Sequence, residues 1–224
     1  MTIQVGMVGI DGIVLAGDTR ISRGPSRGVS ASRMAYDGPK IRISDSGRIA
    51  VTCAHDMQTA NNIADAIFAN MIGGGHSTCE REIKEVCAAR ALGRDVECII
   101  VFADPCPCLY LFQHYTSPTC THTQSQRITG CIATGDMQNP AVFWGMSYYQ
   151  LLPVNRLEHL AACMVVAAGG LNSSMIGGFE LVLCDRDGCR RLSNESAGEL
   201  QSSAKEKIAR IGEFILDLSD LTAK

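Results

Sequence analysis

The first forty residues constrain the fold most, because they describe two strands joined by a tight turn. Residues 2–8 and 13–19 are apolar and rich in β-branched side chains, and the intervening Gly-Ile-Asp-Gly has the composition of a hairpin turn. Folding the chain about that turn places Thr2 roughly opposite Thr19. Asp18 and Arg20 are then expected beside the start of the chain.

Thr2 is a candidate nucleophile if Met1 is removed. A threonine at a free N-terminus can supply both nucleophile and base, because its own α-amine can take the proton from its hydroxyl. The reference pKa of an α-amine, near about 8, suits a general base close to neutral pH. The alternative is that Thr2 is only the first residue of a strand, a position that threonine often occupies.

Lys40 is the second candidate, because the chain has only five lysines, at positions 40, 84, 205, 207 and 224. The other four lie in helical or terminal segments. An ammonium group near Thr2 would lower the pKa values of its amine and hydroxyl, and Asp18 would hold that ammonium charged and oriented. The alternative is a surface lysine and an unrelated aspartate at a strand edge.

Together these residues resemble the threonine proteases of the proteasome β-subunit superfamily, which belongs to the N-terminal nucleophile hydrolases. The resemblance covers most of the chain and is closest to bacterial stand-alone homologues, the β-proteobacterial proteasome homologue first, with HslV and Anbu as relatives. It implies catalytic roles for Thr2, Asp18 and Lys40. The residues that carry it are Thr2 with Val5-Gly6, residues 11–20, Lys40-Ile41 with the hairpin that follows, and Ala133-Thr134-Gly135.

The remaining periodicities predict strand groups separated by helix pairs. We expect a hairpin at 40–54, helices beginning at Asp56 and Ser77, strands from 96 to about 134, helices at 141–151 and 157–168, a hairpin at 179–192 and a final helix through 200–218. Amphipathic helices must cover sheets, so two sheets should pack face to face between helix layers. The resemblance implies the same fold: one α/β (α+β) domain over residues 1–224, a four-layer αββα sandwich with two antiparallel sheets between helix pairs.

The resemblance also implies accessory residues. The family holds its oxyanion with a backbone N–H, and a gapless count from Lys40 assigns that role to Ala54. Relatives have Gly-Ser-Gly where this chain has Gly-Asp136-Met, and their Asp-x-x-Ser becomes Leu-Asn-Ser-Ser, with Ser174 as the retained hydroxyl. Asp136 could instead be an N-cap of the following helix.

The same count predicts a pocket for the substrate residue before the cleaved bond. Thr52 would form its base, Asp56 its wall, and Ala60 would follow one helical turn later. An acidic wall favours a basic substrate residue. The alternative is that Asp56 only caps a helix.

Composition excludes several functions. A net charge of −3 and a pI near 5.9 argue against nucleic-acid binding. We find neither an apolar run long enough to span a bilayer nor a secretory signal. The eleven cysteines mostly occupy apolar periodic segments, which is typical of reduced thiols in the cytoplasm.

One cysteine group invites a zinc interpretation. Cys106 and Cys108 flank a proline, and Cys120, His114 and His122 follow. The spacing differs from that of a zinc ribbon, and the Asp-Pro-Cys-Pro-Cys run is typical of a turn between strands. We therefore expect a turn, and neither metal nor cofactor.

Three function classes follow. The first is a threonine-type endopeptidase subunit that self-associates into a homo-oligomeric double ring, acts on peptides or unfolded proteins, and has an ATPase unfoldase as a candidate partner. The second is a small-molecule amidase of the same fold. The third is a non-catalytic or weakly active ring subunit, which Asp136 and the missing acid of Asp-x-x-Ser favour.

Overall fold

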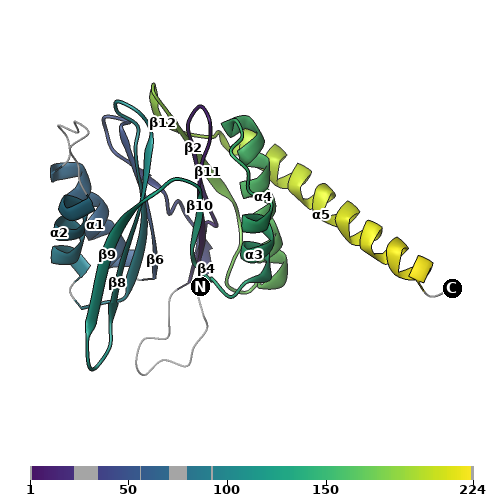
Figure 1. Cartoon of the computed structure of the whole chain (residues 1–224), viewed down its shortest axis with the longest axis horizontal. Helices are drawn as coiled ribbons and strands as arrows, with labels where there is room; N and C mark the ends of the chain where they lie inside the picture. The colour runs from purple at the N-terminus through teal and green to yellow at the C-terminus, as the bar shows by residue number, and fades with distance from the viewer. Residues whose placement is uncertain (1, 23–34, 56, 71–79, 92, 223–224) are drawn as a thin grey trace.

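The fold is a four-layer αββα sandwich, as the sequence predicts (Figure 1). The computed structural model describes residues 2–22, 35–55, 57–70, 80–91 and 93–222. Asp56 and Ser77, which were expected to begin two helices, lie outside these residues. Two five-stranded antiparallel sheets face each other, and helices cover their outer faces.

The first sheet contains both strands of the predicted N-terminal hairpin. Its strand order is β10 (Cys131–Gly135), β1 (Ile3–Val8), β2 (Ile13–Gly17), β11 (Glu180–Asp185) and β12 (Gly188–Arg191). Gln4 pairs with Gly17 in the β1–β2 ladder, and the Asp18 N–H donates to the Ile3 carbonyl at 3.1 Å. The register thus places Thr2 beside the residues that follow β2, which confirms the hairpin prediction.

The second sheet supplies the strand that follows Lys40. Its order is β5 (Arg42–Ile43), β6 (Ile49–His55), β7 (Val96–Phe102), β8 (Cys108–Thr116) and β9 (Thr121–Ile128). A separate pair, β3 (Arg20–Ser22) and β4 (Ala35–Asp37), joins the two sheets along the chain. The segment 103–107 is the turn between β7 and β8, as expected. Among the described residues, no cluster of histidine, cysteine and acidic side chains could hold a metal ion.

Helices cover each sheet on its outer side (Figure 1). The second sheet packs against α1 (Met57–Asn70) and α2 (Glu80–Ala91). The first packs against α3 (Pro140–Ser147), α4 (Val154–Leu171) and the beginning of α5 (Asn194–Thr222), which then extends away from the sandwich. No helix in the described part of the chain is both long and apolar enough to cross a bilayer.

Alternation along β1 determines which side chains reach the space between the sheets. Ile3, Val5 and Met7 pack in the core below α3 and α4. Gly6 faces the other way, where a Cβ would lie 3.1 Å from the side chains of Ile99 and Leu109. By the same alternation Thr2 and Gln4 are directed toward the second sheet, which carries Lys40 at its edge.

Candidate active site

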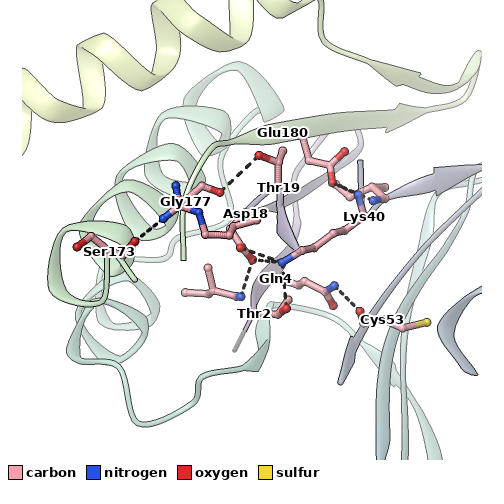
Figure 2. A network of polar contacts seen from close by, with 12 residues as sticks. Thr2, Gln4, Asp18, Thr19, Lys40, Cys53, Ser173, Gly177 and Glu180 are labelled. Atoms are coloured by element: carbon pink, nitrogen blue, oxygen red, sulfur yellow. Dashed lines mark hydrogen bonds and ion pairs between the residues drawn. The ribbon is translucent and has the colours of Figure 1, made fainter. Parts of the chain in front are cut away.

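Lys40, Thr2 and Asp18 meet at the end of β1 between the two sheets (Figure 2). The Lys40 Nζ donates to the Thr2 hydroxyl oxygen at 3.0 Å and to the Asp18 carboxylate oxygens at 2.9 and 2.8 Å. The ammonium group of Lys40 therefore binds both Thr2 and Asp18, although Lys40 lies 38 positions after Thr2 in the sequence. The three residues that the sequence indicates thus lie together, and their catalytic roles stay a prediction.

Asp18 is anchored by β1 as well as by Lys40. It follows β2 directly and is fully buried, and its Oδ1 accepts the Ile3 N–H at 2.9 Å. Burial raises the pKa of Asp18 and lowers the pKa of Lys40, and each charge counteracts the shift of the other. The carboxylate thus fixes the ammonium beside Thr2.

Gly135 and Asp136 approach Thr2 through their backbone. The Asp136 N–H donates to the Thr2 carbonyl at 2.8 Å, and the Gly135 N–H donates to the buried Glu97 carboxylate at 3.0 Å. Gly135 has a positive φ of 92°, and a Cβ there would clash with the Thr2 carbonyl. The end of β10 therefore requires glycine in order to hold Thr2.

The side chain of Asp136 does not cap α3. The N-cap is Asn139, whose Oδ1 accepts the Ala141 N–H at 3.1 Å, so the capping alternative for Asp136 is wrong. The Asp136 carboxylate instead accepts a long contact from the Asn139 amide, at 3.5 Å. Asp136 remains next to Thr2 through its main chain.

The β6 register directs the Ala54 N–H away from the space beside Thr2. On the β5 side, the Ile49 carbonyl accepts from the Ser44 N–H and the Ile49 N–H donates to the Ser44 hydroxyl. On the β7 side, the Arg48 carbonyl accepts from the Ala103 N–H. Alternation therefore turns the backbone of Ala54 toward β7, where its register partner is Glu97. The backbone of Cys53 faces the opposite edge.

Gln4 is a buried polar residue that the sequence analysis missed. Its side-chain amide donates to the Cys53 carbonyl at 2.7 Å, and its oxygen accepts from the Thr134 hydroxyl at 3.2 Å. It thus links β1 both to β6 and to β10. A glutamine that interrupts the apolar run of a buried strand is the signal that could have indicated it.

The residues predicted to form the substrate pocket lie along and beside β6. Thr52 is buried, and its hydroxyl has no hydrogen-bond partner among the residues that the structure describes. It shares the face of Ala50, which packs between the sheets. The Ala60 carbonyl lies on the other face, 3.9 Å from the Cys53 sulfur. Thr52 and the Ala60 carbonyl thus lie on opposite faces of β6, and Asp56 is outside the described residues, so the pocket stays a prediction.

Ser174 makes its contact within its own turn. Its hydroxyl donates to the Asn172 side chain at 3.3 Å, and Ser174 itself is exposed. The neighbouring Ser173 carbonyl accepts from Arg20, as Figure 2 shows. Arg20, which lies three residues after the end of β2, thus contacts the turn that contains Ser174.

A cavity of about 740 Å³ is lined by Arg20 and by residues of α4 and α5. It is mainly apolar, and neither Thr2 nor Lys40 lines it. Its lining includes Arg20, Val165, Leu171, Ile176, Lys205 and Ile208.

Solved structures of Anbu share this fold. The chain is 15% identical to a mutant Anbu from Hyphomicrobium sp. strain MC1, with a TM-score of 0.64 over 96% of this chain and 99% of that one. It is 14% identical to Anbu from Pseudomonas aeruginosa, solved as a helical assembly, with a TM-score of 0.66 over 96% of both chains. For Anbu from Yersinia bercovieri, described as an ancestral β-subunit, the values are 13% and 0.61 over 94% of this chain and 96% of that one.

At these identities the likeness shows the fold alone. It agrees with the αββα architecture that the sequence resemblance implies, and Anbu is among the relatives named there. No protein-family model matches the chain, and no curated protein does.

Proposed function

We propose that this chain is a threonine-type endopeptidase subunit of a self-compartmentalised, proteasome-like ring complex, with Thr2 as its nucleophile. The observation that carries the proposal is the 3.0 Å contact between the Lys40 ammonium and the Thr2 hydroxyl, with Asp18 paired to the same ammonium. A buried cation at a hydroxyl favours loss of the hydroxyl proton. A catalytic role also accounts for the presence of Lys40, Thr2 and Asp18 together at the end of β1.

The proposed reaction begins after Met1 is removed. The Thr2 oxygen attacks the carbonyl carbon of the peptide bond while the α-amine takes the hydroxyl proton. The tetrahedral intermediate then collapses, and the C–N bond breaks. The protonated α-amine of Thr2 returns the proton to the leaving amine. The resulting ester on Thr2 is hydrolysed by water, which releases a carboxylic acid and restores the threonine.

The oxyanion of that intermediate needs a backbone donor. The Cys53 N–H is a better candidate than the Ala54 N–H, because the β6 ladder turns Ala54 toward β7. The Gln4 amide binds the carbonyl of the same residue and would hold the backbone of Cys53 from its C-terminal side. Cys53 is therefore our candidate for the donor that the sequence count assigned to Ala54.

The assembly is also part of the proposal. The Anbu complex of Pseudomonas aeruginosa was solved as a helical assembly. We expect this chain to self-associate into a double ring that encloses Thr2 and admits peptides or unfolded proteins, with an ATPase unfoldase as a candidate partner. The pocket roles of Thr52, Asp56 and Ala60, the accessory role of Ser174 and a cytoplasmic location remain predictions.

A β-lactone peptide probe tests the proposal. Wild-type protein should gain one probe mass, Thr2→Ser should retain labelling, and Thr2→Val, which matches the shape without the hydroxyl, should lose it. Equal labelling of Thr2→Val would contradict the nucleophile assignment. Absence of labelling in wild type lacking Met1 would favour the non-catalytic ring subunit, and a labelled chain with the native mass of a monomer or small oligomer would favour the amidase.

A further inference from the structure

Within the described parts of the chain, the backbone of Lys40 pairs with no strand, although the residue is buried. Lys40 and Ile41 precede β5, which begins at Arg42, and both are at least nine-tenths buried. Buried N–H groups need acceptors. The Oε1 of Glu180 supplies them, because it accepts the Lys40 N–H at 2.5 Å and the Ile41 N–H at 3.0 Å, the first of which is drawn in Figure 2.

Glu180 comes from the same sheet as Asp18. It lies on β11 and pairs with Gly17, the residue immediately before Asp18. The first sheet therefore holds Lys40 at both ends, with Asp18 on the ammonium and Glu180 on the backbone. The second sheet, to which β5 belongs, contributes the chain on which Lys40 is carried.

Arg191 completes this contact from β12. Its guanidinium donates one hydrogen bond to the Oε2 of Glu180 and another to the Ile41 carbonyl. A buried carboxylate is costly unless it is paired, and Arg191 supplies the opposite charge. The N–H groups of residues 40 and 41 and the Ile41 carbonyl are thus all bound by one ion pair.

We infer that Glu180 and Arg191 are positioning residues for Lys40, which keep its ammonium at the Thr2 hydroxyl by fixing the peptide from which it extends. The kinetic part of this inference rests on the proposed function. The structural part does not, because it concerns where Lys40 is held in the resting protein.

The chain offers a matched control on the same hairpin. Arg190 adjoins Arg191 on β12 but pairs with Asp185, in an ion pair whose arginine side chain is 58% exposed. Arg190→Met removes a comparable charge and ion pair without touching the segment before β5. The comparison of Arg191→Met with Arg190→Met therefore isolates the contact to Glu180 and Ile41.

The first readout is NMR of the folded protein labelled on its five lysines. Arg191→Met and Glu180→Gln should move the backbone amide and side-chain signals of Lys40, whereas Arg190→Met should leave them in place. The charges facing the Lys40 ammonium are Asp18, Glu180 and Asp37. Glu180→Gln removes one of them, so the Lys40 titration should move to lower pH. Lys40 signals unchanged in both variants would overturn the inference.

The second readout is the rate at which the β-lactone probe acylates Thr2. Arg191→Met should slow the saturated rate by about 100-fold, the effect of a misplacement of about 1 Å, with little change in the half-saturating probe concentration. Arg191→Lys should recover part of the rate, because it restores the charge without the two-armed guanidinium. Equal rates in Arg191→Met and Arg190→Met would overturn the inference.

The two readouts separate failure of this inference from failure of the proposed function. If wild-type protein is never acylated while the Lys40 signals respond to Arg191→Met, the peptidase proposal fails and the positioning role stands. If Arg191→Met does not fold, Arg191→Lys takes its place in the NMR comparison with Arg190→Lys. Unchanged Lys40 signals would then contradict the role.

Discussion

The ammonium of Lys40 lies 3.0 Å from the hydroxyl oxygen of Thr2, and the same ammonium forms a buried ion pair with Asp18. Thr2 and Asp18 come from the β1–β2 hairpin of one sheet, and Lys40 directly precedes the first strand of the other. The site therefore forms only when the two sheets pack together. Unfolding of either sheet should abolish it.

Replacing Lys40 tests its role in acylation. Lys40→Met keeps a long apolar side chain but removes the charge that favours loss of the Thr2 proton. The rate of Thr2 labelling should fall by about 100-fold or more, the usual effect of removing one electrostatic contact to the reacting groups. Lys207→Met is the control, since Lys207 is exposed on α5. Wild-type labelling in Lys40→Met would show that Lys40 is not catalytic.

The same substitution should destabilise the fold. Lys40→Met leaves the Asp18 carboxylate buried without its cation, which should cost about 3 to 5 kcal/mol in the free energy of unfolding. Adding Asp18→Asn should recover part of that loss, as measured by urea denaturation. Independent, additive losses in the double variant would contradict a coupled pair.

The loss in Lys40→Met should depend on pH. Burial already raises the pKa of Asp18 above its ordinary value, and removing Lys40 removes a charge that lowers it. A raised pKa in the folded state gives stability that is present at low pH and lost as the pH rises through that pKa. The deficit relative to wild type should therefore be smaller near about pH 4 than near about pH 7. A deficit that does not vary with pH would mean that Asp18 does not titrate with folding.

Much of the fold can be predicted from the sequence because it depends on local patterns, whereas Lys40 was assigned to the site by its scarcity and by the family resemblance. The hairpin register follows from the turn, and it brings Thr2 to Asp18. The missed residues depend on strand parity and on packing between sheets. A gapless count cannot tell that the Ala54 N–H faces β7, and nothing local to Glu180 indicates that it binds the backbone of Lys40.

Turn and cap chemistry explains two further differences. Three polar residues, Asp136, Gln138 and Asn139, precede α3, and only the geometry of the turn shows that Asn139 is its N-cap. Ser174 was assigned by resemblance, but its hydroxyl binds Asn172 within its own turn. Such assignments need the loop conformation, which a spacing does not contain.

Removal of Met1 is required by the proposed base. Thr2 is small enough for an ordinary methionine aminopeptidase to act, so we expect no autocatalytic propeptide step. The intact mass of the protein from its native host should lack one methionine. Complete retention of Met1 would block the amine and exclude the proposed mechanism.

Asp136→Ser tests the largest departure from the family pattern. The Asp136 backbone contacts the Thr2 carbonyl, and we predict that the negative charge of its side chain favours the ammonium form of the α-amine. Serine should leave more free amine, which raises turnover near neutral pH and moves the rising limb of the pH–rate profile to lower pH. A peptide with a basic residue before the cleaved bond is the substrate. Superimposable profiles would mean that the carboxylate acts only on Asn139.

The most direct test of the central claim is to locate the adduct formed by a peptide epoxyketone. This reagent can bond to both the hydroxyl oxygen and the α-amine of an N-terminal threonine, so it reports the nucleophile and the base together. Fragmentation mass spectrometry of the treated wild-type protein should find the adduct on Thr2, at a chain start lacking Met1, with both atoms joined to the reagent. An adduct on any other residue, or none on protein that lacks Met1, would contradict the claim that Thr2 is the catalytic nucleophile.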